Sequence, residues 1–72
     1  MWVFRQMRNG TGHEVGYIAE GRFVTQFYMQ EGLHYVMRVV NYLNGGDGLA
    51  GPLEPDYQKW LREELRAKWG AQ

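Results

Sequence analysis

The spacing of apolar residues changes once along this chain, near residue 30, and that change limits the folds the chain can adopt. Before it, three short runs (2–7, 14–19 and 22–27) are rich in β-prone residues and show alternation typical of half-buried β-strands. After it, apolar residues recur every three or four positions, as on one face of an α-helix. A chain of 72 residues makes one domain at most, so both patterns must share one thin core.

Turn-forming residues separate the three strand-like runs. Asn9-Gly10 is a strong hairpin signal because both residue types tolerate positive φ, and Glu20-Gly21 marks a second tight turn. We therefore expect residues 1–28 to form an antiparallel β-meander. The aromatic residues of these runs are expected to be core residues on the sheet: Trp2, Phe4, Phe23 and Phe27.

Two helical segments follow, and a loop rich in glycine separates them. The first helical segment, 29–44, has an apolar stripe, and we expect Arg38 and Asn41 to lie off it in solvent. The loop, 45–54, offers Leu49 and Leu53 as contacts with the core. The second segment, 55–70, starts at a proline, which suits a first helical turn. The two predicted stripes are Leu33, Val36, Met37, Val40 and Leu43, and Tyr57, Trp60, Leu61, Leu65 and Trp69.

These patterns predict a single α+β domain, in which a three-stranded antiparallel β-meander is followed by two α-helices in the order βββαα. A helix must bury its apolar stripe against another layer, so we expect the first helix to pack on the sheet. The second helix could pack beside the first or extend to a partner, because the long loop permits both placements.

The residue types present argue against enzyme activity. The chain contains no serine and no cysteine, which removes the usual acyl-transfer nucleophiles. His13 and Glu14 are neighbours in a predicted strand, so their side chains point to opposite faces. We interpret His13 as an exposed hairpin residue and expect no catalytic residue.

No cofactor and no metal site are expected either. Glu31 and His34 have the Glu-x-x-His spacing of di-metal helical bundles, but those sites need two copies and further carboxylates. Gly45-Gly46-Asp47-Gly48 resembles a phosphate-binding loop only in composition, because it follows a helix and lacks the closing lysine.

Charge and hydropathy exclude other classes of function. Eight basic residues balance eight acidic ones and are spread evenly, which disfavours nucleic-acid binding. A nucleic-acid binder that uses the meander face remains the alternative function, and it would need Arg5, Arg8 and Arg22 to cluster. The chain shows no signal peptide and no apolar run of membrane-spanning length, so we expect a cytoplasmic protein without membrane contact.

Eleven aromatic residues are more than so small a core is expected to enclose, since each can bury about 150–250 Å². A three-stranded sheet would also leave two edges unpaired and one face uncovered. We therefore expect a non-enzymatic protein–protein interaction module whose partner is another protein or a second copy, as in a homodimer. The expected partner-binding residues are Tyr17, Tyr28, Tyr35, Tyr42, Trp60 and Trp69.

Three segments, 15–18, 39–44 and the tail from Pro55, resemble those of small α+β accessory proteins encoded by bacterial viruses. The likeness is one of size and plan, a short meander followed by an amphipathic helix and a charged terminal helix. Proteins of this class bind and inhibit a host protein complex, so the resemblance implies a host protein as partner. It assigns no individual site residue.

Overall fold

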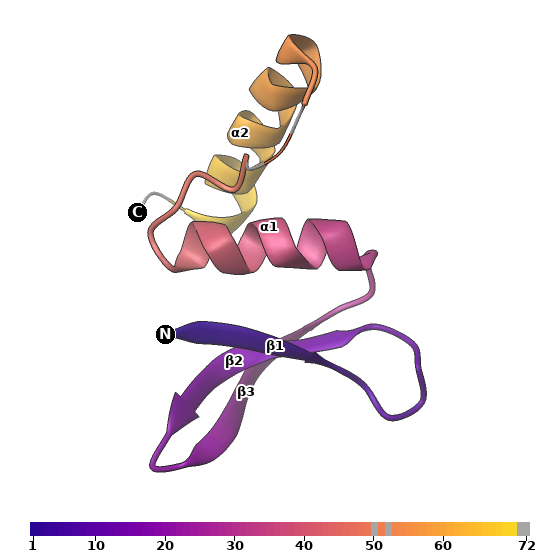
Figure 1. Cartoon of the computed structure of the whole chain (residues 1–72), viewed down its shortest axis with the longest axis vertical. Coiled ribbons are helices and arrows are strands. Elements are labelled where there is room, and N and C mark those ends of the chain that lie inside the picture. Colours follow the sequence, from indigo (N-terminus) through magenta and orange to yellow (C-terminus); the bar gives the residue numbers. More distant parts are fainter. Residues whose placement is uncertain (50, 52, 71–72) are drawn as a thin grey trace.

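Three strands and two helices make up the chain, whose computed structural model describes residues 1–49, 51 and 53–70. In chain order they are β1 (Trp2–Gln6), β2 (His13–Ala19), β3 (Arg22–Met29), α1 (Leu33–Leu43) and α2 (Pro55–Trp69) (Figure 1). The predicted α+β arrangement, three antiparallel strands followed by two helices with the first helix against the sheet, is confirmed. Ala50 and Pro52 of the predicted loop lie outside the described residues, as do residues 71–72 at the C-terminal end of the sequence.

The boundary between sheet and helix differs from the expected one. β3 continues to Met29, which pairs with His13, so the strand is two residues longer than the run 22–27. α1 consequently begins only at Leu33, after the extended N-cap residue Gly32.

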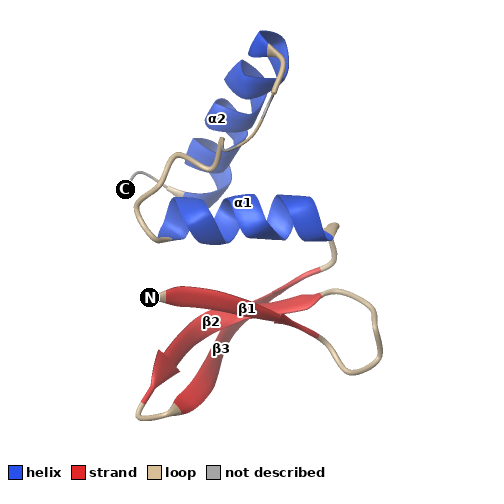
Figure 2. Ribbon diagram, viewed as in Figure 1, coloured by secondary structure: helices blue, strands red, loops and turns tan. Residues whose placement is uncertain are grey.

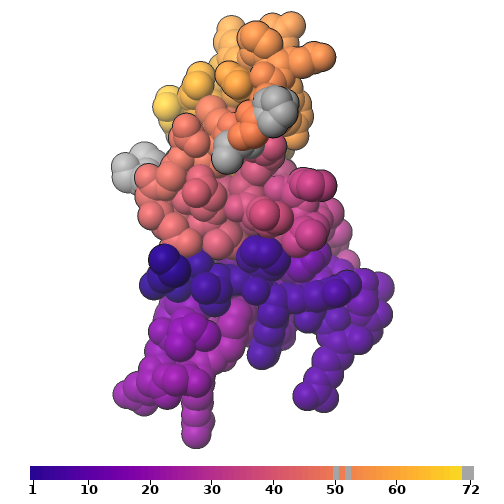
Figure 3. Space-filling model, viewed as in Figure 1, coloured from indigo at the N-terminus to yellow at the C-terminus, as the bar shows by residue number. Residues whose placement is uncertain are grey.

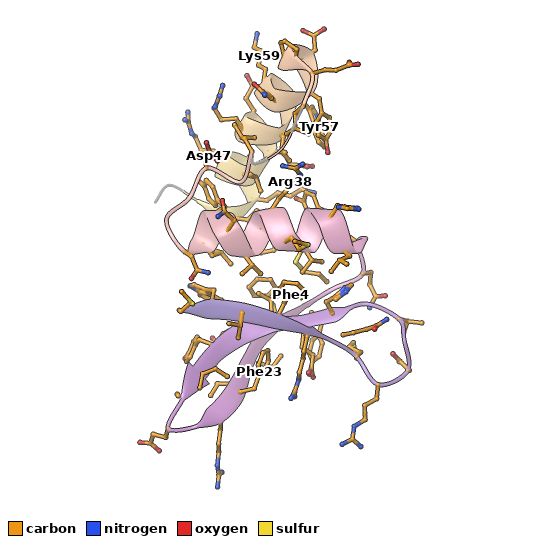
Figure 4. The ribbon with its side chains drawn as sticks, in the orientation of Figure 1. Phe4, Phe23, Arg38, Asp47, Tyr57 and Lys59 are labelled. Atoms are coloured by element: carbon orange, nitrogen blue, oxygen red, sulfur yellow. The ribbon has the colours of Figure 1, made fainter. Side chains whose placement is uncertain are left out.

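The three strands form one sheet in the order β1-β2-β3, and a β-bulge interrupts its second pairing. Val15 pairs with Phe27, whereas the next residue, Gly16, pairs with Thr25, so Gln26 is the extra residue. The bulge reverses the side-chain alternation along β3. Phe27 consequently packs against the core below α1, while Phe23 lies on the opposite face of the sheet (Figure 4). The expectation that Phe23 joins the core was wrong for this reason.

Gly16 permits the close approach of the two strands at the bulge. A Cβ atom at this position would lie 1.9 Å from the carbonyl oxygen of Val24 and 3.0 Å from the Cα atom of Thr25. Both are backbone atoms held in the sheet, so no side-chain rotation could relieve the collision. The bulge therefore depends on a glycine at position 16.

The protein has three layers, with α1 between the sheet and α2 (Figures 1 and 2). The buried residues of α1 match the predicted stripe only in part: Val36 and Val40 are buried as expected, but α1 is covered on two sides. Val39 is fully buried, whereas Leu33 and Met37 of the predicted stripe lie on the free side of the helix, 48% and 49% exposed. The core contains one residue each from β2 and β3, three from α1 and two from α2: Val15, Met29, Val36, Val39, Val40, Leu61 and Leu65.

The loop between the helices is fastened to α1 by two polar side chains. Arg38 donates from Nη1 to the carbonyl oxygen of Gly48 at 3.0 Å, and Asn41 accepts the Gly48 N–H at 2.9 Å. Leu49 and Leu53 pack against the core, as expected. Asn41 is exposed, as expected, whereas Arg38 is half-buried, and both side chains bind the backbone of the loop that follows their helix.

The free edge of β1 is bound at its start by the residue that ends α1. The Trp2 N–H donates to Asn44 Oδ1 at 2.6 Å, and Asn44 Nδ2 donates to the Trp2 carbonyl oxygen at 2.9 Å. A single side-chain amide thus makes the pair of hydrogen bonds that a neighbouring strand would make. This contact joins the N-terminus to the end of α1.

Candidate protein-binding surface

The free flank of α2 carries two exposed aromatic rings that stack on each other. The ring centroids of Tyr57 and Trp60 are 5.7 Å apart with an interplanar angle of 26°. Their three-residue spacing places them on one side of the helix, while Leu61 and Leu65 are fully buried. Tyr57 is 43% exposed and Trp60 is 51% exposed, so the pair presents aromatic area to solvent rather than to the core.

The position of α2 explains why these rings remain uncovered. The first turns of α2 project beyond the rest of the molecule (Figures 1 and 3). The protein measures 38 × 26 × 20 Å, and its radius of gyration is 12.7 Å. A compact chain of this length would have a radius of gyration of about 11 Å. Tyr57 and Trp60 lie on this projecting part of α2 and remain about half exposed.

The charged residues of α2 continue this flank towards its C-terminal end. Glu64 and Lys68 follow Trp60 at four-residue intervals, and their side chains form an ion pair at 3.2 Å. The hydrogen bond from Lys68 to Glu64, together with the negative charge of that carboxylate, raises the pKa of the lysine above its usual 10.5. The aromatic pair is thus bordered by a charge-balanced strip, as is common at the rim of an interface.

α1, the layer next to α2, contributes an exposed apolar edge and a pocket. Leu33 and Met37 are one helical turn apart, and each is about half exposed. Beside them is a pocket of about 280 Å³ between α1 and the loop that follows it. Its lining consists of His34, Met37, Arg38, Asn41 and Gly48.

The face of the sheet away from α1 also exposes apolar side chains. Ile18 is 55% exposed and Tyr28 is 61% exposed. Arg5 forms an ion pair with Glu14 across the strands, and its guanidinium carbon lies 4.4 Å from the centroid of the Phe23 ring. Polar contacts therefore already engage the middle of this face, and its exposed apolar residues lie apart, because Ile18 pairs with Phe23 near one end of the sheet and Tyr28 pairs with Glu14 near the other.

Two of the predicted partner-binding residues are exposed, but they lie on different elements. Trp60 belongs to the stacked pair on α2, and Tyr28 belongs to the open face of the sheet. Both are available to a partner, although one patch does not contain them together. Their role in binding stays a prediction.

The other four predicted residues make contacts within the fold. Tyr17 is half-buried and meets the ring of Trp2 edge-on, with centroids 5.7 Å apart. Tyr35 and Tyr42, on α1, are half-buried beside the end of α2, where the Tyr42 hydroxyl donates to the Gly70 carbonyl oxygen. These contacts give the residues a role in stabilising the fold, and their role in binding stays a prediction.

Trp69 links all three layers. Its ring stacks on Phe27 of β3 with centroids 4.9 Å apart and an interplanar angle of 29°. Its Nε1 donates to the hydroxyl of Tyr35 on α1 at 3.5 Å. These contacts make Trp69 the residue through which the end of α2 reaches the sheet.

Tyr57 is the functional candidate that the sequence reasoning missed, because it was assigned to the buried stripe of the second helix. The spacing carried no signal against that assignment, because Tyr57 precedes Leu61 by four residues and so continues the ridge of Leu61, Leu65 and Trp69. Its exposure follows from the placement of α2, whose first turns project beyond the rest of the molecule, and there it stacks with Trp60.

The three arginines of the nucleic-acid alternative do not cluster. Arg8 lies in the loop between β1 and β2, whereas Arg22 begins β3 beside the turn at the other end of the sheet. The seven residues of β2 separate those ends by about 20 Å. Arg5 lies between them in β1 and is paired with Glu14. The arrangement provides no continuous basic track.

His13 occupies a different environment from the one expected. It is half-buried at the start of β2, with its ring 5.9 Å from that of Phe4 in an edge contact. Its Nδ1 atom is buried and has no hydrogen-bond partner within the described part of the chain. The interpretation as an exposed hairpin residue was therefore wrong, because β2 starts at His13 and turns the ring towards Phe4.

Residues 1–49, 51 and 53–70 include no group of three or more histidine and acidic side chains placed to hold a metal ion. Neither helix of this part of the chain is long and apolar enough to cross a bilayer. Comparison with protein-family models, curated proteins and solved structures finds no match.

Proposed function

We propose that this chain is a non-enzymatic module that binds another protein through the surface formed by α1 and the free flank of α2. The observation that carries the proposal is the Tyr57–Trp60 stack, in which two large rings remain about half exposed. Tyrosine and tryptophan are enriched among the residues that dominate binding energy at interfaces. The exposed apolar edge of Leu33 and Met37 adds area on the neighbouring helix.

The fold itself supports this assignment. α2 is anchored by Leu61, Leu65 and Trp69, so the fold does not require Tyr57 and Trp60 to be aromatic. Large aromatic rings held on a projecting helix lose little conformational freedom on binding, because each has only two side-chain torsions. The partner is a different protein or a second copy of the chain. Inhibition of a host protein complex, which the resemblance to small phage proteins implies, would be one form of such binding.

Affinity capture with matched variants tests the proposal. The purified chain and its Trp60→Ala and Tyr28→Ala variants are immobilised, and proteins retained from a lysate of the source cells are quantified by mass spectrometry. Tyr28→Ala is the matched control because it also removes an exposed ring, from the open face of the sheet. We expect Trp60→Ala to lose a specific partner that Tyr28→Ala retains. Equal retention by both variants would refute the assignment to α2.

The nucleic-acid alternative has a separate test. Arg22 lies at the opposite end of the sheet from Arg8, and the formal net charge is zero. We therefore expect no electrophoretic mobility shift with single- or double-stranded DNA or RNA at low salt. A complex that forms at low salt and dissociates steeply as salt is raised would support phosphate binding instead.

A further inference from the structure

We infer that the free flank of α2 binds an arginine side chain of the protein partner. The guanidinium would lie over the exposed ring of Trp60, with the carboxylates of Asp56 and Glu63 beside it. This inference rests on the proposed function and deepens it, because it names the chemistry that the partner must present. The partner segment would carry an arginine next to apolar residues.

The charged side chains that adjoin Trp60 on α2 are all acidic. On a helix surface, the neighbours of a residue are those three and four positions away. Asp56 precedes Trp60 by four residues. Glu63 and Glu64 follow it by three and four. The remaining neighbour is Tyr57, which supplies the second ring of the stack. A cation over Trp60 would therefore meet negative charge on both sides of the ring.

The basic residues in the middle of α2 lie on a different flank of the helix. Their spacing of three and four residues places them in one row: Lys59, Arg62 and Arg66. None of them is three or four positions from Tyr57 or Trp60. Figure 4 shows Lys59 and Tyr57 leaving α2 on opposite sides. The charges of α2 are thus segregated, although the formal net charge of the chain is zero.

Two of the three acidic neighbours are available to a partner. Glu64 pairs with Lys68 at 3.2 Å, so the fold already balances its charge. Asp56 and Glu63 are both exposed, and neither forms an ion pair within residues 1–49, 51 and 53–70. The negative charge left beside the Tyr57–Trp60 stack selects a basic occupant.

The sheet of the same protein contains the kind of contact that we infer. The guanidinium carbon of Arg5 lies 4.4 Å from the centroid of the Phe23 ring, and Arg5 also pairs with Glu14. Tryptophan is the best aromatic ring for a contact with a cation. A guanidinium can stack on an aromatic face while its N–H groups bind a carboxylate. Arginine therefore fits Trp60 and its acidic neighbours better than a compact ammonium would.

The position of Trp60 along α2 is compatible with a cation. A helix dipole disfavours positive charge at the N-terminus, but the effect falls off within the first turn. α2 begins at Pro55, so Trp60 lies in the second turn. Asp56 lies in the first turn and offsets the partial positive charge there.

The experiment uses the full chain, labelled with ¹⁵N, and two capped amino acids of nearly the same shape. N-acetylarginine methylamide carries a positive charge, and N-acetylcitrulline methylamide is neutral. Each is titrated at constant ionic strength to about 50 mM, above the millimolar dissociation constant expected of fragments of this size. The indole N–H signals of Trp2, Trp60 and Trp69 are followed by NMR. We expect a saturable shift of the Trp60 signal with the arginine compound and about fivefold weaker binding of the citrulline compound.

Two double variants test the role of the carboxylates. Asp56→Asn with Glu63→Gln should reduce binding of the arginine compound to that of the citrulline compound. Glu20→Gln with Asp47→Asn is the matched control, because it removes the same formal charge from a turn of the sheet and from the loop after α1. Asparagine at position 47 keeps the oxygen type that accepts the Leu49 N–H. The control should retain the arginine response.

Three results would overturn the inference. In the wild-type chain, they are equal binding of the two compounds, or arginine-induced shifts at Trp2 or Trp69 without one at Trp60. Either result is independent of any effect of the variants on folding. The third is an equal loss of the response in both double variants, which would show that net charge alone is responsible.

The outcomes also separate this inference from the proposed function. If Trp60→Ala abolishes partner capture but the arginine and citrulline compounds bind alike, the binding surface stands and the arginine contact is refuted. If the arginine compound binds at Trp60 but no partner depends on Trp60, the inference of a protein ligand is refuted together with the proposed function.

Discussion

Gly16→Ala is expected to destabilise the protein more than any other exchange of glycine for alanine at an unstrained φ. The added methyl carbon would lie 1.9 Å from the Val24 carbonyl oxygen, about half of a normal van der Waals separation. Relief requires β2 and β3 to move apart at the bulge, which breaks the pairing that positions Phe27 and Met29 towards the core.

The size of the effect follows from that geometry. Overpacking by one methyl group in a packed site usually costs about 1–3 kcal/mol. Because both atoms facing the Gly16 methyl belong to the backbone, we expect at least the upper end, about 3 kcal/mol. A domain of 72 residues has a free energy of unfolding of about 4–11 kcal/mol. The substitution would therefore remove between a quarter and three quarters of it.

Urea denaturation followed by tryptophan fluorescence measures this loss, and Gly21→Ala is the control. Gly21 also lies next to a strand, has a φ of +75°, and has open space where a Cβ would be. Its substitution adds backbone strain of about 1–2 kcal/mol without a collision. A Gly16→Ala variant that is no less stable than Gly21→Ala would refute the close approach of the strands at the bulge.

Three further predictions address the contacts that hold the elements together. Asn44→Ala removes both hydrogen bonds to Trp2, so the free energy of unfolding should fall by about 1 kcal/mol. The backbone amides of β1 should then exchange faster with deuterium, and unchanged exchange would contradict a role of Asn44 in holding the edge of β1. Gly32→Ser should raise the melting temperature, because α1 has no side-chain N-cap and serine adds one worth about 0.5 kcal/mol. Lys68→Met should lower the urea midpoint at pH 8 but not well above pH 10.5, because a raised pKa in the folded state stabilises it only while the lysine is protonated. A difference that persists at high pH would show that packing, and not charge, is responsible.

Local patterns along the sequence were sufficient to predict the strands, the turns and both helices. Each depends on residues close to one another in the chain, such as the alternation in β1 or the Pro55 start of α2. The bulge at Gln26 was not predictable from alternation, because it depends on the approach of a second strand. Gly16, a glycine within a strand pattern, was its one local signal.

The candidate site was predicted less well, because exposure is decided by how elements pack. Met37 and Val39 are both apolar, and only the placement of α2 on the far side of α1 decides that Val39 is buried and Met37 is not. The same placement packs the half-buried Trp69 against the core and leaves Trp60 exposed. The pocket requires the loop to fold back onto Arg38, which the spacing of residues within one helix does not show.

The affinity of a purified partner for the chain tests the proposed binding surface most directly. Isothermal titration calorimetry with the wild-type protein, Trp60→Ala and Tyr28→Ala would give three dissociation constants. An aromatic residue central to an interface contributes about 2 kcal/mol or more, so Trp60→Ala should weaken binding by about thirtyfold or more. Tyr28→Ala should change it less than threefold. Undiminished binding by Trp60→Ala would contradict the assignment of the partner to the exposed flank of α2.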